Sequence, residues 1–178
     1  MEQLSEASDK MEAAVKESAG RRAERVKKGD TLALPYKELE TYLPATVSGY
    51  TAEAPVGESV KMGGMAFSTA DRRYTQGDNW VTVKLMDYNG ANTLFQGVSA
   101  VFGMGMESEN DESLVRTSPL KLDGTRAMET LHKKDGDAEL SLIANDRFMV
   151  SIKANHQKDL TLVEAVAQQL DLSKLNKL

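Results

Sequence analysis

Methionine is the most unusual chemical feature of this sequence, with nine residues among 178. Two pairs lie close to glycine, namely Met62 with Met65 and Met104 with Met106. Thioether sulfur is a soft ligand that suits Cu(I), and the chain has no cysteine that would compete for the metal. Methionine also fills irregular gaps in protein cores. The two pairs therefore predict either a soft-metal site or ordinary packing.

Enzyme chemistry is weakly represented. The chain has two histidines, His132 and His156, and neither stands in a spacing that suggests a catalytic triad. The sequence has no GxSxG nucleophile motif and no glycine-rich phosphate loop. We therefore expect a non-enzyme without a cofactor, and the alternative is a small hydrolase-type enzyme with a cleft near His132.

Four carboxylates lie close together between residues 107 and 112: Glu107, Glu109, Asp111 and Glu112. Oxygen clusters of this kind can bind Ca²⁺. The twelve-residue calcium-loop pattern, with its glycine at position six, is missing here. A solvated acidic loop is therefore the simpler interpretation.

Aromatic residues gather on one predicted β-hairpin. Trp80 shares a strand face with Met86 and Tyr88, and Tyr74 lies on the preceding strand. Aromatic residues and methionine are enriched at protein interfaces. These four residues are therefore the candidate recognition surface for a protein or a small apolar ligand. The alternative is that a helix covers this face of the sheet.

The elements that position these residues are mostly strands. Alternating apolar residues and turn signals predict strands over 66–76, 80–88, 114–122, 125–133, 138–144 and 147–155. Asp123-Gly124 and Asp135-Gly136 are strong hairpin turns. Residues 49–57 read as a turning segment, because Gly49, Pro55 and Gly57 punctuate them.

Four helical segments complete the pattern. A short helix is expected between Pro35 and Pro44, and an apolar helix over 92–102 is expected to be buried. Thr161 and Glu164 form a capping-box pattern that opens a last helix. Residues 4–28 favour a helix with a thin apolar stripe, typical of an arm or tether.

The predicted fold class is therefore α+β, a meandering antiparallel sheet flanked by helices, with an N-terminal helical arm. We expect residues 1–31 to form the arm and residues 32–178 to form a single domain. A length of 178 residues suits this organisation.

Charge and hydropathy exclude several classes of partner. The formal net charge of −5 argues against a nucleic-acid binder. No window approaches the roughly 18 consecutive apolar residues of a transmembrane helix. The sequence starts without the basic and apolar regions of a secretory signal. Basic residues in 20–28 leave contact of the arm with an anionic membrane surface open.

A series of short motifs resembles an uncharacterised family of bacterial exported proteins and lipoproteins with a PsbP-like α+β domain. The motifs are YKELETYLP at 36–44, VSGY at 47–50, GMAFS at 64–68, RY at 73–74, DYNG at 87–90, DRFMV at 146–150 and LDLSKL at 170–175. The resemblance covers about residues 34–176. It implies a periplasmic or envelope location if a signal was removed, and otherwise the chain would be cytoplasmic. It carries over no catalytic residues.

These observations together predict a non-enzymatic binding or accessory module of the cell envelope. It would engage a protein or small apolar ligand through a sheet face or through its methionine-bearing loops.

Overall fold

The computed structural model describes residues 2–103, 105–122 and 125–178, which fall into two compact units, residues 1–32 and 33–178. The first unit is dominated by α1 (Glu2–Lys27), the predicted helical arm. Gly29, with φ of 78°, ends α1. The amide of Asp30 donates to the carbonyl of Arg25, and that of Gly29 donates to the carbonyl of Val26. These two bonds form the Schellman motif that glycine favours at helix ends.

Within the described residues, the second unit contains one nine-stranded antiparallel sheet in the order β1-β3-β4-β9-β8-β7-β6-β5, with β2 also pairing with β3. The strands are β1 (Thr51–Ala52), β2 (Val56–Met62), β3 (Met65–Gln76), β4 (Asn79–Gly90), β5 (Glu107–Glu109), β6 (Ser113–Thr117), β7 (Thr125–His132), β8 (Asp137–Ala144) and β9 (Phe148–Ala154). The α+β prediction is confirmed.

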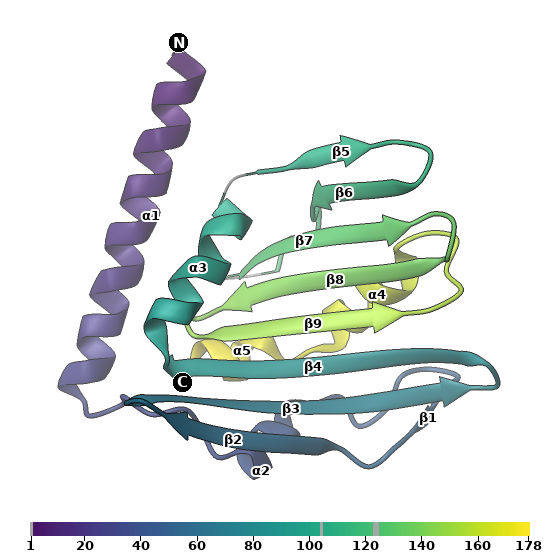
Figure 1. Cartoon of the computed structure of the whole chain (residues 1–178), viewed down its shortest axis with the longest axis horizontal. Coiled ribbons are helices and arrows are strands. Elements are labelled where there is room, and N and C mark those ends of the chain that lie inside the picture. The colour runs from purple at the N-terminus through teal and green to yellow at the C-terminus, as the bar shows by residue number, and fades with distance from the viewer. Residues whose placement is uncertain (1, 104, 123–124) are drawn as a thin grey trace. The chain divides into compact units, whose positions relative to one another are not determined.

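The two faces of this sheet differ in their cover (Figure 1). Behind the sheet in that view lie α2 (Tyr36–Leu39), α4 (Thr161–Gln169) and α5 (Leu172–Asn176). The 3₁₀ helix η1 (Glu40–Tyr42) directly follows α2. In front lies α3 (Asn92–Gly103), which contacts β4 and β7. We call the first face the core face and the second the front face.

The core face is built by strict alternation. Val81, Val83 and Leu85 of β4 are at most 2% exposed and belong to one cluster with residues of β8, β9 and α4. β4 pairs with β9 so that Leu85 lies opposite Val150. Period-two patterning therefore identified both the strands and the side that they bury.

Several local predictions were wrong. The segment 49–57, expected to be a turn, contains β1 and the start of β2, because these strands pair with β3 and take their structure from it. The acidic loop contains the short strand β5. β6 ends at Thr117, and the predicted turn at residues 123–124 lies outside the described residues.

The predicted capping box of α4 is also absent. The N-cap residue is Leu160, and it makes no side-chain cap hydrogen bond. Asp159 Oδ1 instead accepts the amide of Thr161 at 2.9 Å. Glu164, the other half of the predicted box, pairs with Arg116 of β6 at 3.1 Å. A tertiary ion pair therefore takes the carboxylate that the local pattern assigned to the cap.

A buried ion pair joins the end of β4 to the β8–β9 turn. Arg147 donates through Nε to Asp87 Oδ1 at 3.0 Å and through Nη2 to Oδ2 at 2.5 Å, and both side chains are at most 2% exposed. Asp87 also accepts the amides of Leu34 and Asn89, each at 2.9 Å. The carboxylate therefore fixes β4, the β8–β9 turn and residue 34 together.

Replacing Arg147 with Met should destabilise the second unit by about 3–5 kcal/mol, because it leaves the Asp87 carboxylate buried without its counter-charge. Chemical denaturation of the full chain measures this loss. Lys134→Met is the matched control, because Lys134 pairs with Glu112 where both side chains are 68% exposed. The control should change stability by less than about 1 kcal/mol. Equal effects of the two substitutions would contradict the assignment.

Candidate functional site

The four residues of the predicted recognition surface do not form one surface. Tyr74 lies on the core face, where it is completely buried and its hydroxyl donates to the carbonyl of Pro44 at 2.5 Å. Burial raises its pKa to about 12. Tyr74 is buried because it lies opposite Val81, a core residue, in the β3–β4 register. Including Tyr74 among the binding residues was therefore wrong.

Trp80, Met86 and Tyr88 do share the front face, where all three are half-buried. Arg73 stacks over the Trp80 ring at 4.8 Å from its centroid. Tyr88 packs between Phe67 and Phe95 of α3, with ring centroids 6.4 and 6.2 Å away. α3 therefore covers the Tyr88 end of this face, and both aromatic side chains are already used in contacts within the chain.

The outer side of α3 carries apolar residues into solvent. Phe95 is 3% exposed and anchors the helix, whereas Leu94 and Val101 are each 45% exposed. The exposed positions recur at helical spacing along one side: Thr93, Leu94, Gln96, Gly97, Ala100 and Val101. The prediction of a buried helix was wrong, because the twelve residues cover the sheet with one side only.

The exposed side of α3 has a signal in the sequence. α3 contains no charged residue, in a chain where 28% of residues are charged. An exposed helix usually carries charged residues on its solvent side, and apolar character all round is typical of burial. The uncharged composition of α3 is suited equally to burial within this chain and to burial against another molecule.

The methionine pairs are only partly described. Met62 and Met65 lie opposite each other across the β2–β3 turn and are 69% and 38% exposed. Met106 is 40% exposed, and Met104 lies outside the described residues. The structure therefore brings together one pair of thioethers, and among the described residues no group of three or more His, Asp or Glu side chains is arranged to hold a metal ion.

The histidines and the acidic segment have structural surroundings. His132 is exposed at the end of β7. His156 Nδ1 lies 3.1 Å from Asn79 Oδ1 in the turn after β9. Glu109 bonds to Lys133 at 2.8 Å, which holds the pKa of that carboxyl below its usual value.

A polar cluster lies where β6, β7 and α4 meet. Glu129 is completely buried on the core face and accepts Arg116 Nε at 2.7 Å and Ser118 Oγ at 2.5 Å. Arg116 Nη2 reaches Glu164 of α4 at 3.1 Å. Only strand register brings Arg116 opposite Glu129, so no local sequence pattern predicts this cluster.

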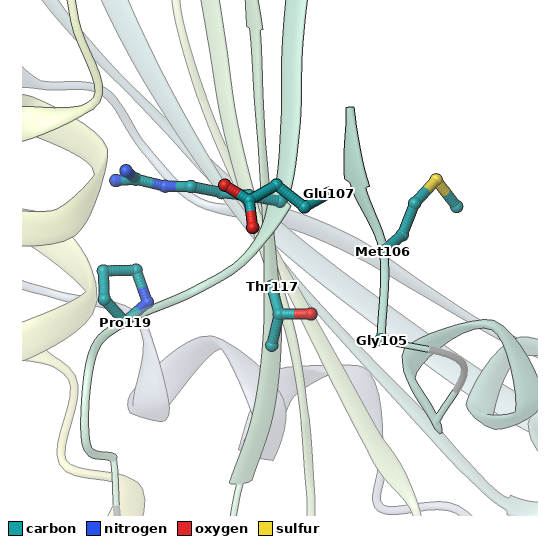
Figure 2. A pocket seen from close by; sticks show the side chains of 6 residues that line it. Gly105, Met106, Glu107, Thr117 and Pro119 are labelled. Carbon is teal, nitrogen blue, oxygen red and sulfur yellow. The ribbon is translucent and has the colours of Figure 1, made fainter. Parts of the chain in front are cut away.

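A cavity of about 400 Å³ opens beside Arg116. Figure 2 shows Pro119 and Met106 on opposite sides of it, with Glu107 and Thr117 between them. The polar lining has one cation, Arg116, whose Nε and Nη2 already bond to carboxylates. The lining is mixed, with Met106 and Pro119 beside these polar groups, so it lacks the mostly apolar character typical of sites for small apolar ligands.

Glu164 has a raised pKa. The main cause is burial, followed by the charge of the neighbouring Glu129, and Arg116 opposes the shift only in part. The arrangement therefore disfavours the ionised form of Glu164 in the folded chain.

No protein-family model, curated protein or solved structure matches this chain. The resemblance to exported lipoproteins therefore stays a prediction. In the part of the chain that the structure describes, no helix combines the length and the apolar character needed to span a membrane.

Glu164→Gln should gain stability relative to the unsubstituted chain as pH rises. The folded state raises the pKa of Glu164 above its usual 4.5, so the native chain binds more protons and loses stability as pH rises through that window. Glutamine does not titrate, so the stability difference should grow as pH rises from the usual 4.5 through the raised pKa of Glu164. Denaturation midpoints across that range measure it.

Glu58→Gln on the exposed strand β2 controls for the loss of one negative charge. A difference between Glu164→Gln and the parent chain that stayed constant with pH would contradict the assignment.

Proposed function

We propose that this chain is a non-enzymatic binding or accessory module that engages an uncharged, apolar helical segment of a protein partner. The observation that carries the proposal is the solvent-exposed side of α3, here called the α3 surface and defined by Thr93, Leu94, Gln96, Gly97, Ala100 and Val101. These residues contain no charge, and Leu94 and Val101 expose nearly half of their surface. Exposed apolar patches of this kind commonly mark interaction sites.

The chemistry of the α3 surface selects the partner. An uncharged surface offers no counter-charge to a charged ligand. Binding to it is favoured instead by the burial of apolar surface. Nothing lies within 4 Å of the position that a Cβ would take on Gly97. With Thr93 and Ala100 on the same side, this leaves the helix backbone open to close approach, as small residues do where two helices pack. A helix is therefore the favoured partner.

A protein partner is better supported than a small apolar ligand. Small apolar ligands are held in concave, mostly apolar sites. The cavity beside Arg116 has a mixed lining that includes the charged Glu107 and Arg116. The exposed apolar residues Leu94 and Val101 lie instead on the convex outer side of a helix. Met65, which is 38% exposed, adds a further apolar side chain near the start of α3. The residue after it, Ala66, pairs with Gly90 just before α3 begins.

The proposal extends to the cell envelope, as the family resemblance implies. The last part of α1 and the residue after it hold four cations that are at least partly exposed, namely Arg21, Arg22, Lys27 and Lys28, whereas Arg25 is buried. Such a segment suits attraction to an anionic membrane surface, worth about 1 kcal/mol per cation near the surface. The arm would then hold the second unit close to partners at the membrane.

Site-specific photo-crosslinking in bacterial cells producing the full chain tests this function. A benzophenone amino acid at Gln96, on the α3 surface, should give a discrete adduct with another protein. The same probe at Lys84, exposed on the front face away from α3, is the matched control and should give none. No adduct from Gln96, or equal adducts from both positions, would contradict the proposal.

Val101→Glu in the Gln96 probe chain should reduce that adduct at least tenfold, because binding would bury the new carboxylate against an apolar partner. The substitution falls on an exposed position, so folding stability should change by no more than about 0.5 kcal/mol. Circular dichroism and thermal unfolding check that the variant remains folded. A folded variant that gave the parent amount of adduct would remove α3 from the interface.

A further inference from the structure

Strand β2 forms an open edge of the sheet. Within the described residues it pairs only with β3, and five of its seven residues are exposed. Open edges present unpaired backbone N–H and C=O groups that can pair with another strand. β2 is regular along its whole length, with every residue from Val56 to Met62 in register with β3.

The turn after β2 determines which of its peptide groups face outward. Gly63 and Gly64 both have positive φ, 59° and 81°, as a two-residue type I′ turn requires. Such a turn is closed by hydrogen bonds between its flanking residues, here Met62 and Met65. Because hydrogen-bonded pairs alternate along an antiparallel ladder, the peptide groups of Lys61, Ser59 and Gly57 point away from β3.

We propose that β2 pairs antiparallel with β2 of a second copy of this chain, with Ser59 opposite Ser59 of the second copy. This register also places Gly57 opposite Lys61 of the second copy, and Lys61 opposite Gly57. All three outward-facing residues then form hydrogen-bonded pairs, each exchanging two N–H···O=C bonds. A shift in either direction would leave some of these groups without a partner.

The side chains of β2 fit the same register. Val56 and Met62, at its two ends, are 59% and 69% exposed and point to the front face. Around the two-fold axis, Val56 lies opposite Met62 of the second copy, so each exposed apolar side chain gains an apolar neighbour. Glu58 lies opposite Val60 of the second copy, and Lys61 lies opposite glycine. No like charges face each other directly.

The opposite edge of the sheet shows the contrast. β5 has three residues, Glu107, Ser108 and Glu109, all exposed. Self-pairing centred on Ser108 would place Glu107 opposite Glu109 of the second copy, and like charges directly opposite each other are destabilising. β5 therefore carries the charge protection that open edges usually have, whereas β2 is self-complementary.

Seven residues of paired strand bury less surface than a standard interface, which removes about 1,200–2,000 Å² in total. We therefore expect a dimer in the micromolar range. The strand pairing would leave α3 on each copy free, so dimerisation does not depend on the proposed partner.

Sedimentation equilibrium of the full chain tests the dimer. Lys61→Pro removes an outward N–H while leaving the β2–β3 ladder its donors, a position where edge strands accept proline. It should weaken dimerisation at least tenfold. Lys61→Ala, which removes the charge and keeps the N–H, should retain the dimer. A monomer at millimolar concentration, or equal dimerisation of both variants, would overturn the proposal.

A cysteine test keeps the register falsifiable even if Lys61→Pro unfolds. The chain has no cysteine, so Ser59→Cys introduces a single thiol at the two-fold axis. Hydrogen-bonded partners have Cα atoms about 5.5 Å apart, within disulfide range. Oxidation should link Ser59→Cys chains into a covalent dimer much faster than Lys61→Cys chains. Equal rates would overturn the register.

Discussion

The ion pair between Asp87 and Arg147 is the interaction on which the rest of this structure depends. It is buried near the end of β4, beside the β8–β9 turn, where one carboxylate holds a guanidinium and two backbone amides. Because an isolated charge at that depth would be unstable, β4, the β8–β9 turn and Leu34 must come together as one unit. The pair lies just before Gly90, where β4 ends and the chain turns into α3.

The helices cover the two faces of the sheet to different extents. α2, α4 and α5 bury the core face, and α3 packs against the front face chiefly through Phe95. The helix over the front face is uncharged, and its far side meets solvent. That combination makes α3, rather than the aromatic residues of β4, the surface most suited to a partner. Of the aromatic residues of β4, Tyr88 packs against Phe95 of α3 and so helps to hold that helix on the sheet.

Local patterns predicted those parts of the fold whose residues are themselves periodic. Alternation in Val81–Leu85 and Phe148–Ala154 identified two central strands, and the order of turns indicated an antiparallel sheet. β2 and β5 were missed because glycine, serine and glutamate carry little strand preference, and pairing with β3 and β6 decides their structure.

The candidate site was harder to predict for a related reason. A pattern shows which residues share a face of an element, but it does not show what covers that face. Tyr74 was assigned to the surface and is in the core, whereas Leu94 and Val101 were assigned to the core and are exposed. Glu129, a charged residue at a core position, likewise depends on Arg116 from another strand.

Methyl NMR of the full chain with a soluble nitroxide tests the central claim most directly, because it measures solvent access to α3 side chains without a partner. The account predicts strong relaxation of the Leu94 and Val101 methyl groups, and little relaxation of Val163 and Val166 beneath the core face. Equal protection of all four side chains would mean that the outer side of α3 is covered, and would contradict the account.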